Sequence, residues 1–201
     1  MTRVSLVGLS STSLLLLCAG CATLSAGLDI PIGEWSGNGR FVCARQAPAE
    51  ETDRVRLDTS GGDYPTRLTI QQAPGVNPDA RRLEILSQRG RHECMEGDRT
   101  HLIAILEPTA RNVDGGVTIY RLAELGFSFD ESPPDLDEGP EGWAHASCTP
   151  IDGQLVLRIH YMETFADTFR FQGGVLYKEG SYLPDIDEGF IHWSERLRRK
   201  R

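Results

Sequence analysis

The stretch GQLVLRIHYMETFADTFRFQGG, residues 153–174, decides the fold class of this 201-residue chain. Its apolar side chains recur at every second position in two successive runs. They are Leu155, Leu157, Ile159 and Tyr161 in the first run, and Phe165, Phe169 and Phe171 in the second. A period of two residues is typical of a β-strand that buries one face. The stretch therefore predicts two consecutive half-buried strands.

The same period recurs along the chain, and no window after residue 33 combines a helical period with a helical length. Gly-Gly and Asp-Gly pairs separate the runs, and such pairs tolerate the positive φ that tight hairpin turns require. The pairs are Gly61-Gly62, Gly115-Gly116, Asp152-Gly153 and Gly173-Gly174. About ten strands are expected, near residues 34–44, 53–58, 64–71, 81–88, 100–107, 116–123, 142–148, 153–162, 165–172 and 175–180, with a last one near 189–197.

Strands joined by successive hairpins favour an antiparallel meander. A meander of this length has two open edges, and closing it into a barrel removes both. We therefore expect an all-β fold made of one antiparallel β-barrel of about ten strands, with a two-sheet β-sandwich as the alternative. A small barrel of this kind can hold one small ligand in its interior.

The first expected strand reads GEWSGNGRF, from Gly33 to Phe41. Its G-x-W motif resembles the opening motif of lipocalins. The longer form G-x-W-x-G-x-G, over Gly33–Gly39, resembles the nitrobindin family, although the chain continues as FVCAR where that family usually has a Tyr-Pro segment. The resemblance covers about seven residues and implies a barrel of about ten antiparallel strands. It also implies haem held by a histidine near the C-terminus, a position that His192 occupies.

The N-terminal segment has the features of an export signal. After the basic start Met1–Arg3, residues 4–17 carry no charge, and this run is too short to span a membrane. The following letters LCAGC resemble the bacterial lipobox. That resemblance implies cleavage of residues 1–20 as a signal peptide, a lipidated Cys21, a tether over residues 21–32 and a barrel domain over residues 33–201. Ala22, in place of Asp, resembles the state that sorts such lipoproteins to the outer membrane, facing the periplasm.

The pair Cys18 and Cys21 also has the C-x-x-C spacing of redox dithiols and zinc sites. Residues 1–40 contain no histidine and no further cysteine, so a zinc site there would lack ligands. A lipobox, with Cys21 as the lipidated residue, is therefore the favoured interpretation of this cysteine pair.

Removal of the first 20 residues leaves 181, a length that suits one domain. The leader carries one basic and no acidic residue, so the net charge changes from −8 to −9. An acidic chain is a poor nucleic-acid partner, because phosphate contacts need clustered Lys and Arg. The one basic run, Arg196–Arg201, is expected to be a solvated terminus, with contact to anionic lipid or to a partner as the alternative.

Three cysteines remain for disulfide formation in an exported protein: Cys43, Cys94 and Cys148. They allow three different single bridges, and the sequence does not choose among them.

The sequence contains no strong catalytic or metal-binding motif. The chain has no G-x-S-x-G elbow and no Walker loop, and we expect a non-enzymatic protein without a cofactor. The segment HECME at His92–Glu96 ends in Glu instead of His and is interpreted as a loop. A metal site formed by His92, His101 and Cys94 is the alternative, while His145 and His160 are interpreted as surface or core residues.

Two acidic segments repeat each other: PDLDEG at Pro134–Gly139 and PDIDEG at Pro184–Gly189. Each is expected to be an acidic turn between strands, and residues 130–141 are expected to form a loop at the barrel mouth. Binding of Ca²⁺ would require both segments to meet, because one alone supplies too few oxygen ligands.

These observations lead to one functional expectation with two alternatives. The expected function is binding or carriage of a small apolar ligand by a lipid-anchored envelope protein, as fold analogy suggests. The first alternative is a ligand-free structural or interaction module of an envelope complex. The second is a haem-binding barrel that uses His192. The expected ligand-lining residues are Trp35, Phe41, Tyr161, Phe165, Phe169 and Phe171.

Overall fold

The structure is a computed structural model that describes residues 30–46, 57–73, 82–91, 99–113, 115–128, 134–139, 144–183 and 189–200. Within these ranges the chain forms eleven β-strands and no helix, so this part contains no helix that is long and apolar enough to cross a membrane. The strands are β1 (Gly33–Gln46), β2 (Leu57–Gln72), β3 (Leu83–Gly90), β4 (Arg99–Val113), β5 (Val117–Ser128), β6 (Asp137–Glu138), β7 (His145–Ile151), β8 (Gln154–Met162), β9 (Phe165–Gln172), β10 (Val175–Tyr182) and β11 (Phe190–Arg199). Cys18, Cys21 and Cys94 lie outside the described residues.

Ten of the strands close into one antiparallel barrel. Each pairs with its neighbour in chain order, except that the short β6 is bypassed by the pairing of β5 with β7. The circle closes because β1 pairs with β11, with Trp35 opposite Arg199. The predicted antiparallel meander barrel is therefore confirmed, and the two-sheet sandwich is not formed as separate sheets.

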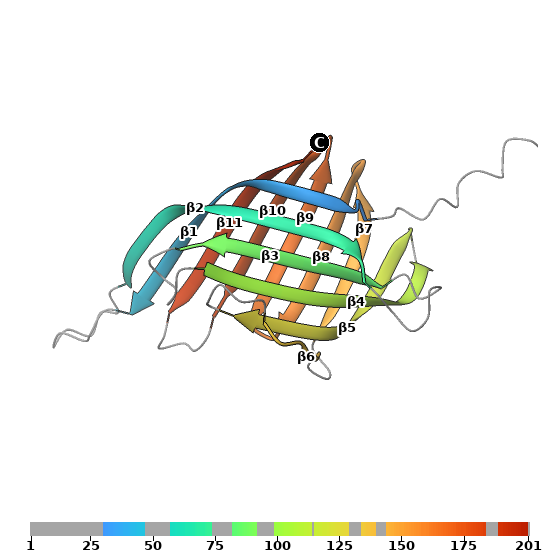
Figure 1. Cartoon of the computed structure of the whole chain (residues 1–201), viewed down its shortest axis with the longest axis horizontal. Coiled ribbons are helices and arrows are strands. Elements are labelled where there is room, and N and C mark those ends of the chain that lie inside the picture. Colours follow the sequence, from blue (N-terminus) through green and yellow to red (C-terminus); the bar gives the residue numbers. More distant parts are fainter. Residues whose placement is uncertain are drawn as a thin grey trace, which may run out of the picture.

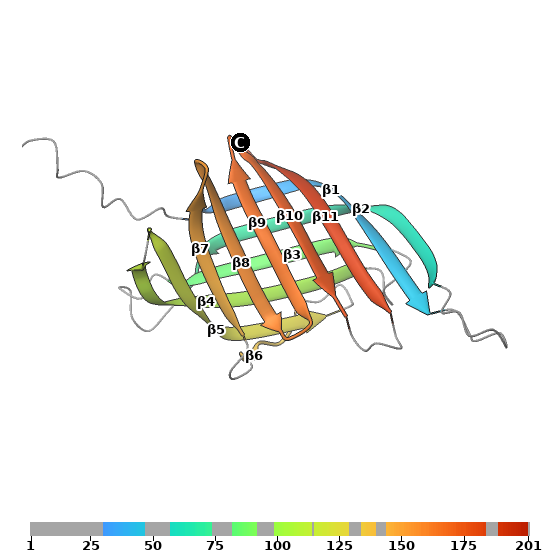
Figure 2. The same ribbon diagram turned by 180° about the vertical axis from the view of Figure 1, so that it is seen from behind.

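The barrel is flattened into two layers that cross at a steep angle. In Figure 1, β2, β3, β4 and β5 run across the front, while β8 to β11 run behind them. Figure 2 shows the same arrangement from behind. The long β1 belongs to both layers, because it pairs with β2 along one edge and with β11 along the other.

Three of the four predicted turns are present. Positive φ angles occur at Gly115 and Gly116, at Asp152 and Gly153, and at Gly173 and Gly174, which connect β4 to β5, β7 to β8 and β9 to β10. These backbone angles are the ones that tight hairpins need and that glycine adopts without steric cost.

The predicted turn at Gly61 and Gly62 is wrong, since both residues lie inside β2. Gly61 is opposite Val42, and Gly62 is opposite Phe41, in the ladder with β1. A Cβ atom at Gly61 would lie 2.9 Å from the carbonyl oxygen of Phe41. Glycine occupies this position because β1 and β2 approach each other too closely for a side chain, and not because the chain reverses direction. Two separate strands near 53–58 and 64–71 are therefore not formed, although residues 53–56 lie outside the described part.

Most of the basic run near the C-terminus lies in a barrel strand, and its described basic side chains are exposed to solvent, as expected. Through Arg199 it belongs to β11, which pairs with both β1 and β10. Leu197 is fully buried, whereas Arg196 and Arg198 point outward and are exposed. β11 extends as far as Arg199 because it pairs with β1 over this length, and this pairing closes the barrel.

The interior has an apolar main cluster and a smaller aromatic one. The main cluster takes inward side chains from β1 to β11, such as Trp35, Leu157 and Phe169. The smaller cluster is formed by Phe41, Cys43, Tyr64 and Trp193. Cys43 is disulfide-bonded to a partner outside the described residues, whereas Cys148 is buried with a free thiol.

Candidate functional site

Four charged side chains lie inside the barrel, and together they form what we call the buried charge cluster. They come from four strands: Arg89 from β3, Asp167 from β9, Lys178 from β10 and Glu195 from β11. Their exposed fractions are 5%, 1%, 0% and 3%. Buried ions are costly unless they are paired and hydrogen-bonded, so the partners of each group decide whether the cluster is stable.

Glu195 is the best-satisfied member of the cluster. Its Oε1 atom lies 2.7 Å from Nε of Arg89 and accepts a hydrogen bond of 2.9 Å from the Tyr64 hydroxyl. Its Oε2 atom accepts a hydrogen bond of 3.0 Å from the Thr66 hydroxyl. Both carboxylate oxygens are therefore used, by donors from β2 and β3.

Asp167 is held in a similar way from the other layer. Its Oδ1 atom accepts a hydrogen bond of 2.8 Å from Nε1 of Trp193. Its Oδ2 atom accepts from the hydroxyl of Tyr161 at 3.1 Å and lies 3.2 Å from Nζ of Lys178. Lys178 also donates to the hydroxyl of Ser87 at 3.0 Å, which connects the two layers of the flattened barrel.

Arg89 has one nitrogen atom without a hydrogen-bond partner. Its Nη2 atom is buried and lies 3.8 Å from Oδ1 of Asp167, beyond hydrogen-bonding distance. The guanidinium carbon lies 4.3 Å from the centroid of the Trp193 ring, a cation–π contact that compensates in part.

This geometry shifts the pKa values of Glu195 and Lys178. Burial acts to raise the pKa of Glu195, but Lys178, Arg89 and the hydrogen bonds from Tyr64 and Thr66 together hold this pKa below its ordinary value. Burial lowers the pKa of Lys178, and nearby Arg89 lowers it further. Counted by residue type, the cluster contains two basic and two acidic side chains, so neither sign of charge is in excess.

The side chains expected to line a ligand pocket lie in this packed interior. Trp35, Phe41, Tyr161, Phe169 and Phe171 are buried, and Phe165 is half-buried. Tyr161 and Phe169 have no accessible surface, so no space large enough for a water molecule adjoins them. Whether an apolar ligand binds among these residues stays a prediction.

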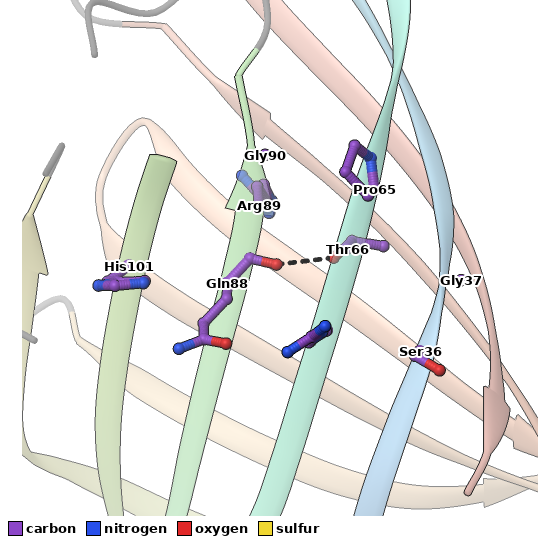
Figure 3. A pocket seen from close by; sticks show the side chains of 9 residues that line it. Ser36, Gly37, Pro65, Thr66, Gln88, Arg89, Gly90 and His101 are labelled. Atoms are coloured by element: carbon purple, nitrogen blue, oxygen red, sulfur yellow. Dashed lines mark hydrogen bonds between the residues drawn. The ribbon is translucent and has the colours of Figure 1, made fainter. Parts of the chain in front are cut away.

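Three pockets formed by described residues, of 380, 590 and 330 Å³, are lined largely from outside the core. The 380 Å³ pocket lies over β1 to β4, and Figure 3 shows several of its residues. Ser36, Arg67, Gln88 and His101 stand directly opposite one another across these four strands, on the outward side of each. Thr66 Oγ1 donates to the backbone oxygen of Gln88 at 3.2 Å beneath this row (Figure 3).

The four described histidines do not converge on one site, and His92 lies outside the described residues. His192 is exposed on the outer face of β11, where its ring stacks on Phe190 with centroids 6.3 Å apart. His145 and His160 stack face to face across β7 and β8 at 4.8 Å, and His101 is buried on β4. No group of three His, Cys, Asp or Glu side chains that could hold a metal ion occurs in the described ranges.

The acidic segments are only partly described. In the first, Asp137 and Glu138 form β6 and pair with Leu125 and Glu124 of β5, with both acidic side chains exposed. Ordered strand pairing thus occurs inside the expected loop at residues 130–141. Residues 184–188 of the second segment lie outside the described part, so a meeting of the two segments stays untested.

Comparison with protein-family models, with curated proteins and with known solved structures finds no match to this chain.

The sequence analysis missed the buried charge cluster, although a signal for it was present. Each of its members occupies an inward position of the two-residue period. Asp167 lies between Phe165 and Phe169, and Glu195 lies between Trp193 and Leu197. A charged residue in phase with buried apolar neighbours indicates an interior ion, provided that the phase is followed through every position.

Proposed function

We propose that this protein is a non-enzymatic lipoprotein of the bacterial cell envelope, anchored by lipid on Cys21, whose barrel is a filled interaction module. The proposed location is the outer membrane, facing the periplasm. The LCAGC motif at Leu17–Cys21 and the uncharged run before it support the anchor. The anchor and the location rest on the sequence alone.

The observation that supports an interaction module is that side chains of the barrel fill its interior. Lys178, Tyr161 and Phe169 have no accessible surface, and the charged groups of the buried charge cluster pair with one another. Barrels of about this size can be packed solid with their own side chains. A carrier of drug-sized ligands would instead need an internal cavity of about 300 Å³ or more.

Fractionation of cells tests the anchor. Cys21→Ser should abolish labelling by radioactive palmitate and release the protein from membranes after a salt wash. Cys18→Ser is the matched control and should keep both, because residue 18 is removed with the leader. Membrane attachment that survives Cys21→Ser would refute the anchor.

Carriage of a small apolar ligand is the second candidate, and one group of side chains favours it. Phe165 is half-buried, and its ring lies 4.6 Å from Tyr161, 5.7 Å from Tyr182 and 5.8 Å from Trp193, measured between centroids. A partly open aromatic group of this kind is a common lining for apolar ligands.

A titration separates the two candidates. The fragment 22–201, which contains all eleven strands, is mixed with a fluorescent fatty acid. A filled module should give no saturable signal, whereas a carrier should bind at micromolar level and lose binding in Phe165→Ala. Saturable binding that Phe165→Ala removes would overturn the module. A titration of the same fragment with hemin tests the haem alternative. If haem binds through His192, a Soret band should appear with the wild type and disappear in His192→Ala.

A further inference from the structure

Three arginines lie close together on the outer face of the barrel where β11, β1 and β2 are neighbours. Arg198 and Arg67 both stand opposite Ser36, one from each side, so they are two strand spacings apart, about 10 Å at the backbone. Arg196 precedes Arg198 by two residues on the same face and stands opposite Asn38. We call Arg67, Arg196 and Arg198 the arginine face.

The arginine face is exposed and has no carboxylate partner in the described part of the chain. None of the three guanidinium groups has an ion pair with a described residue, and Arg196 has only a distant contact, 5.9 Å from its Cζ to the Tyr177 ring centroid. Other basic side chains nearby behave differently. Arg40 pairs with Asp63 at 3.1 Å, Lys200 with Glu34 at 3.0 Å, and Arg170 with Glu179 at 2.8 Å.

Unpaired positive charge is unexpected on a chain with a net charge of −8. With 29 acidic residues against 21 Lys and Arg, carboxylates are in excess, yet none is used at this face. Guanidinium groups bind phosphate oxygens in a fork geometry, with paired N–H donors. Asp63 and Glu179 line the same pocket as Arg196, but each is already paired with another arginine, Arg40 and Arg170 respectively. At physiological ionic strength the field of carboxylates more than about 8 Å away is screened.

The position of the face relative to the proposed anchor indicates which phosphates it meets. Eight residues lie between Cys21 and Ile30, the first described residue, so the nine chain steps from one to the other span at most about 30 Å. Ser36, between Arg67 and Arg198, lies only six residues further along the chain. Ile32, at the entry to β1, is 47% exposed and accepts a hydrogen bond at its backbone oxygen from Arg199. The entry to β1 therefore exposes one apolar side chain and a further cation, Arg199.

We propose that the arginine face docks on the phosphate groups of anionic lipids in the membrane that carries the Cys21 anchor. The docking would fix the orientation of the barrel, with the outer face of β11, β1 and β2 against the membrane. This inference rests on the proposed lipid anchor for its geometry. Its test does not, because the binding of headgroups can be measured without the anchor.

The test uses fragment 22–201, which lacks Cys21 and contains all eleven strands. Sedimentation with vesicles compares phosphatidylcholine alone with phosphatidylcholine containing phosphatidylglycerol. The variant Arg67→Gln/Arg196→Gln/Arg198→Gln removes the face. The matched control, Arg40→Gln/Arg121→Gln/Arg170→Gln, removes three ion-paired arginines and changes the net charge equally. Circular dichroism confirms that both variants are folded.

The wild type and the control should bind the anionic vesicles and not the neutral ones. The face variant should bind about a hundredfold more weakly, since each basic residue near an anionic surface contributes about fivefold to affinity. Binding should also fall between about 50 and 500 mM NaCl. Equal loss in both variants would overturn the proposal. Failure of the wild type to bind anionic vesicles would overturn it too. Neither result bears on the anchor, which the Cys21→Ser fractionation tests separately.

Discussion

Replacing Lys178 by methionine tests whether the buried charge cluster holds the barrel together as a balanced set. Nζ of Lys178 lies 3.2 Å from Oδ2 of Asp167, 3.8 Å from Oε1 of Glu195 and 3.0 Å from Oγ of Ser87. Methionine keeps most of the side-chain volume, so the change removes the charge with little cavity formation. Arg89 would then be the one cation of the cluster facing two buried carboxylates.

The expected loss is large relative to the total stability. Removing one partner of a buried ion pair costs about 3–5 kcal/mol, because the other charge stays buried without compensation. A domain of this kind has a free energy of unfolding of about 5–15 kcal/mol, and the loss corresponds to a decrease of roughly 6–20 °C in Tm. Lys200→Met is the matched control. Lys200 pairs with Glu34 at 3.0 Å on the exposed surface, where a pair contributes at most about 1 kcal/mol.

Urea unfolding, followed by the fluorescence of buried Trp193, measures both variants. A second measurement separates charge imbalance from lost packing. The double variant Lys178→Met/Asp167→Asn restores the balance of one cation and one anion, and it should be more stable than Lys178→Met alone. The reasoning is refuted if Lys178→Met costs no more than Lys200→Met, or if Asp167→Asn simply adds a further loss.

Three other predictions concern single positions. Gly180→Ala should destabilise the protein by about 1–3 kcal/mol in a thermal melt, because its Cβ atom would lie 2.2 Å from Oδ1 of Asp167. Cys148 should not react with a thiol reagent such as DTNB in the native protein and should react once the protein is unfolded, because burial raises the pKa of its thiol to about 12. Lowering the pH from about 7 to about 5 should destabilise the wild type more than His160→Gln, measured by urea unfolding, because burial and His145 hold the pKa of His160 below its ordinary value and the folded state resists a proton that the unfolded chain accepts.

Each of these predictions has a control and a result that would contradict it. Ser181→Ala, next to Gly180, should change stability by less than about 0.5 kcal/mol, and an equal loss in both variants would contradict the steric argument. Native Cys148 that reacts as fast as the unfolded thiol would contradict its burial. The stability that depends on neutral His160 is fully present above the pKa of this residue in the unfolded chain. It is lost as the pH falls from that value toward the lower pKa of His160 in the folded protein. An identical pH dependence in His160→Gln would show that the His145–His160 stack does not contribute.

The outcome at the glycine pairs shows where local sequence is sufficient. At Gly115-Gly116, Asp152-Gly153 and Gly173-Gly174 the flanking strands are consecutive and the turn is tight, so local backbone preference determines the structure. The pair Gly61-Gly62 has the same local chemistry, yet the chain continues straight through it. There the deciding contact is with Phe41 of β1, about 20 residues away, which a local pattern does not contain.

The same division applies to the interior and to the C-terminus. The period of two residues, as at Leu155–Tyr161, by itself determined that the chain forms half-buried antiparallel strands, because alternation is a property of each strand alone. Only the tertiary structure decided that β11 closes the barrel against β1 and places Arg196 and Arg198 beside Arg67. It also decided that Arg89 and Glu195, 106 residues apart, meet inside at 2.7 Å. The energy of a buried charge depends on which opposite charge lies within a few ångströms, and that distance is set by closure of the whole sheet, not by any neighbouring residue.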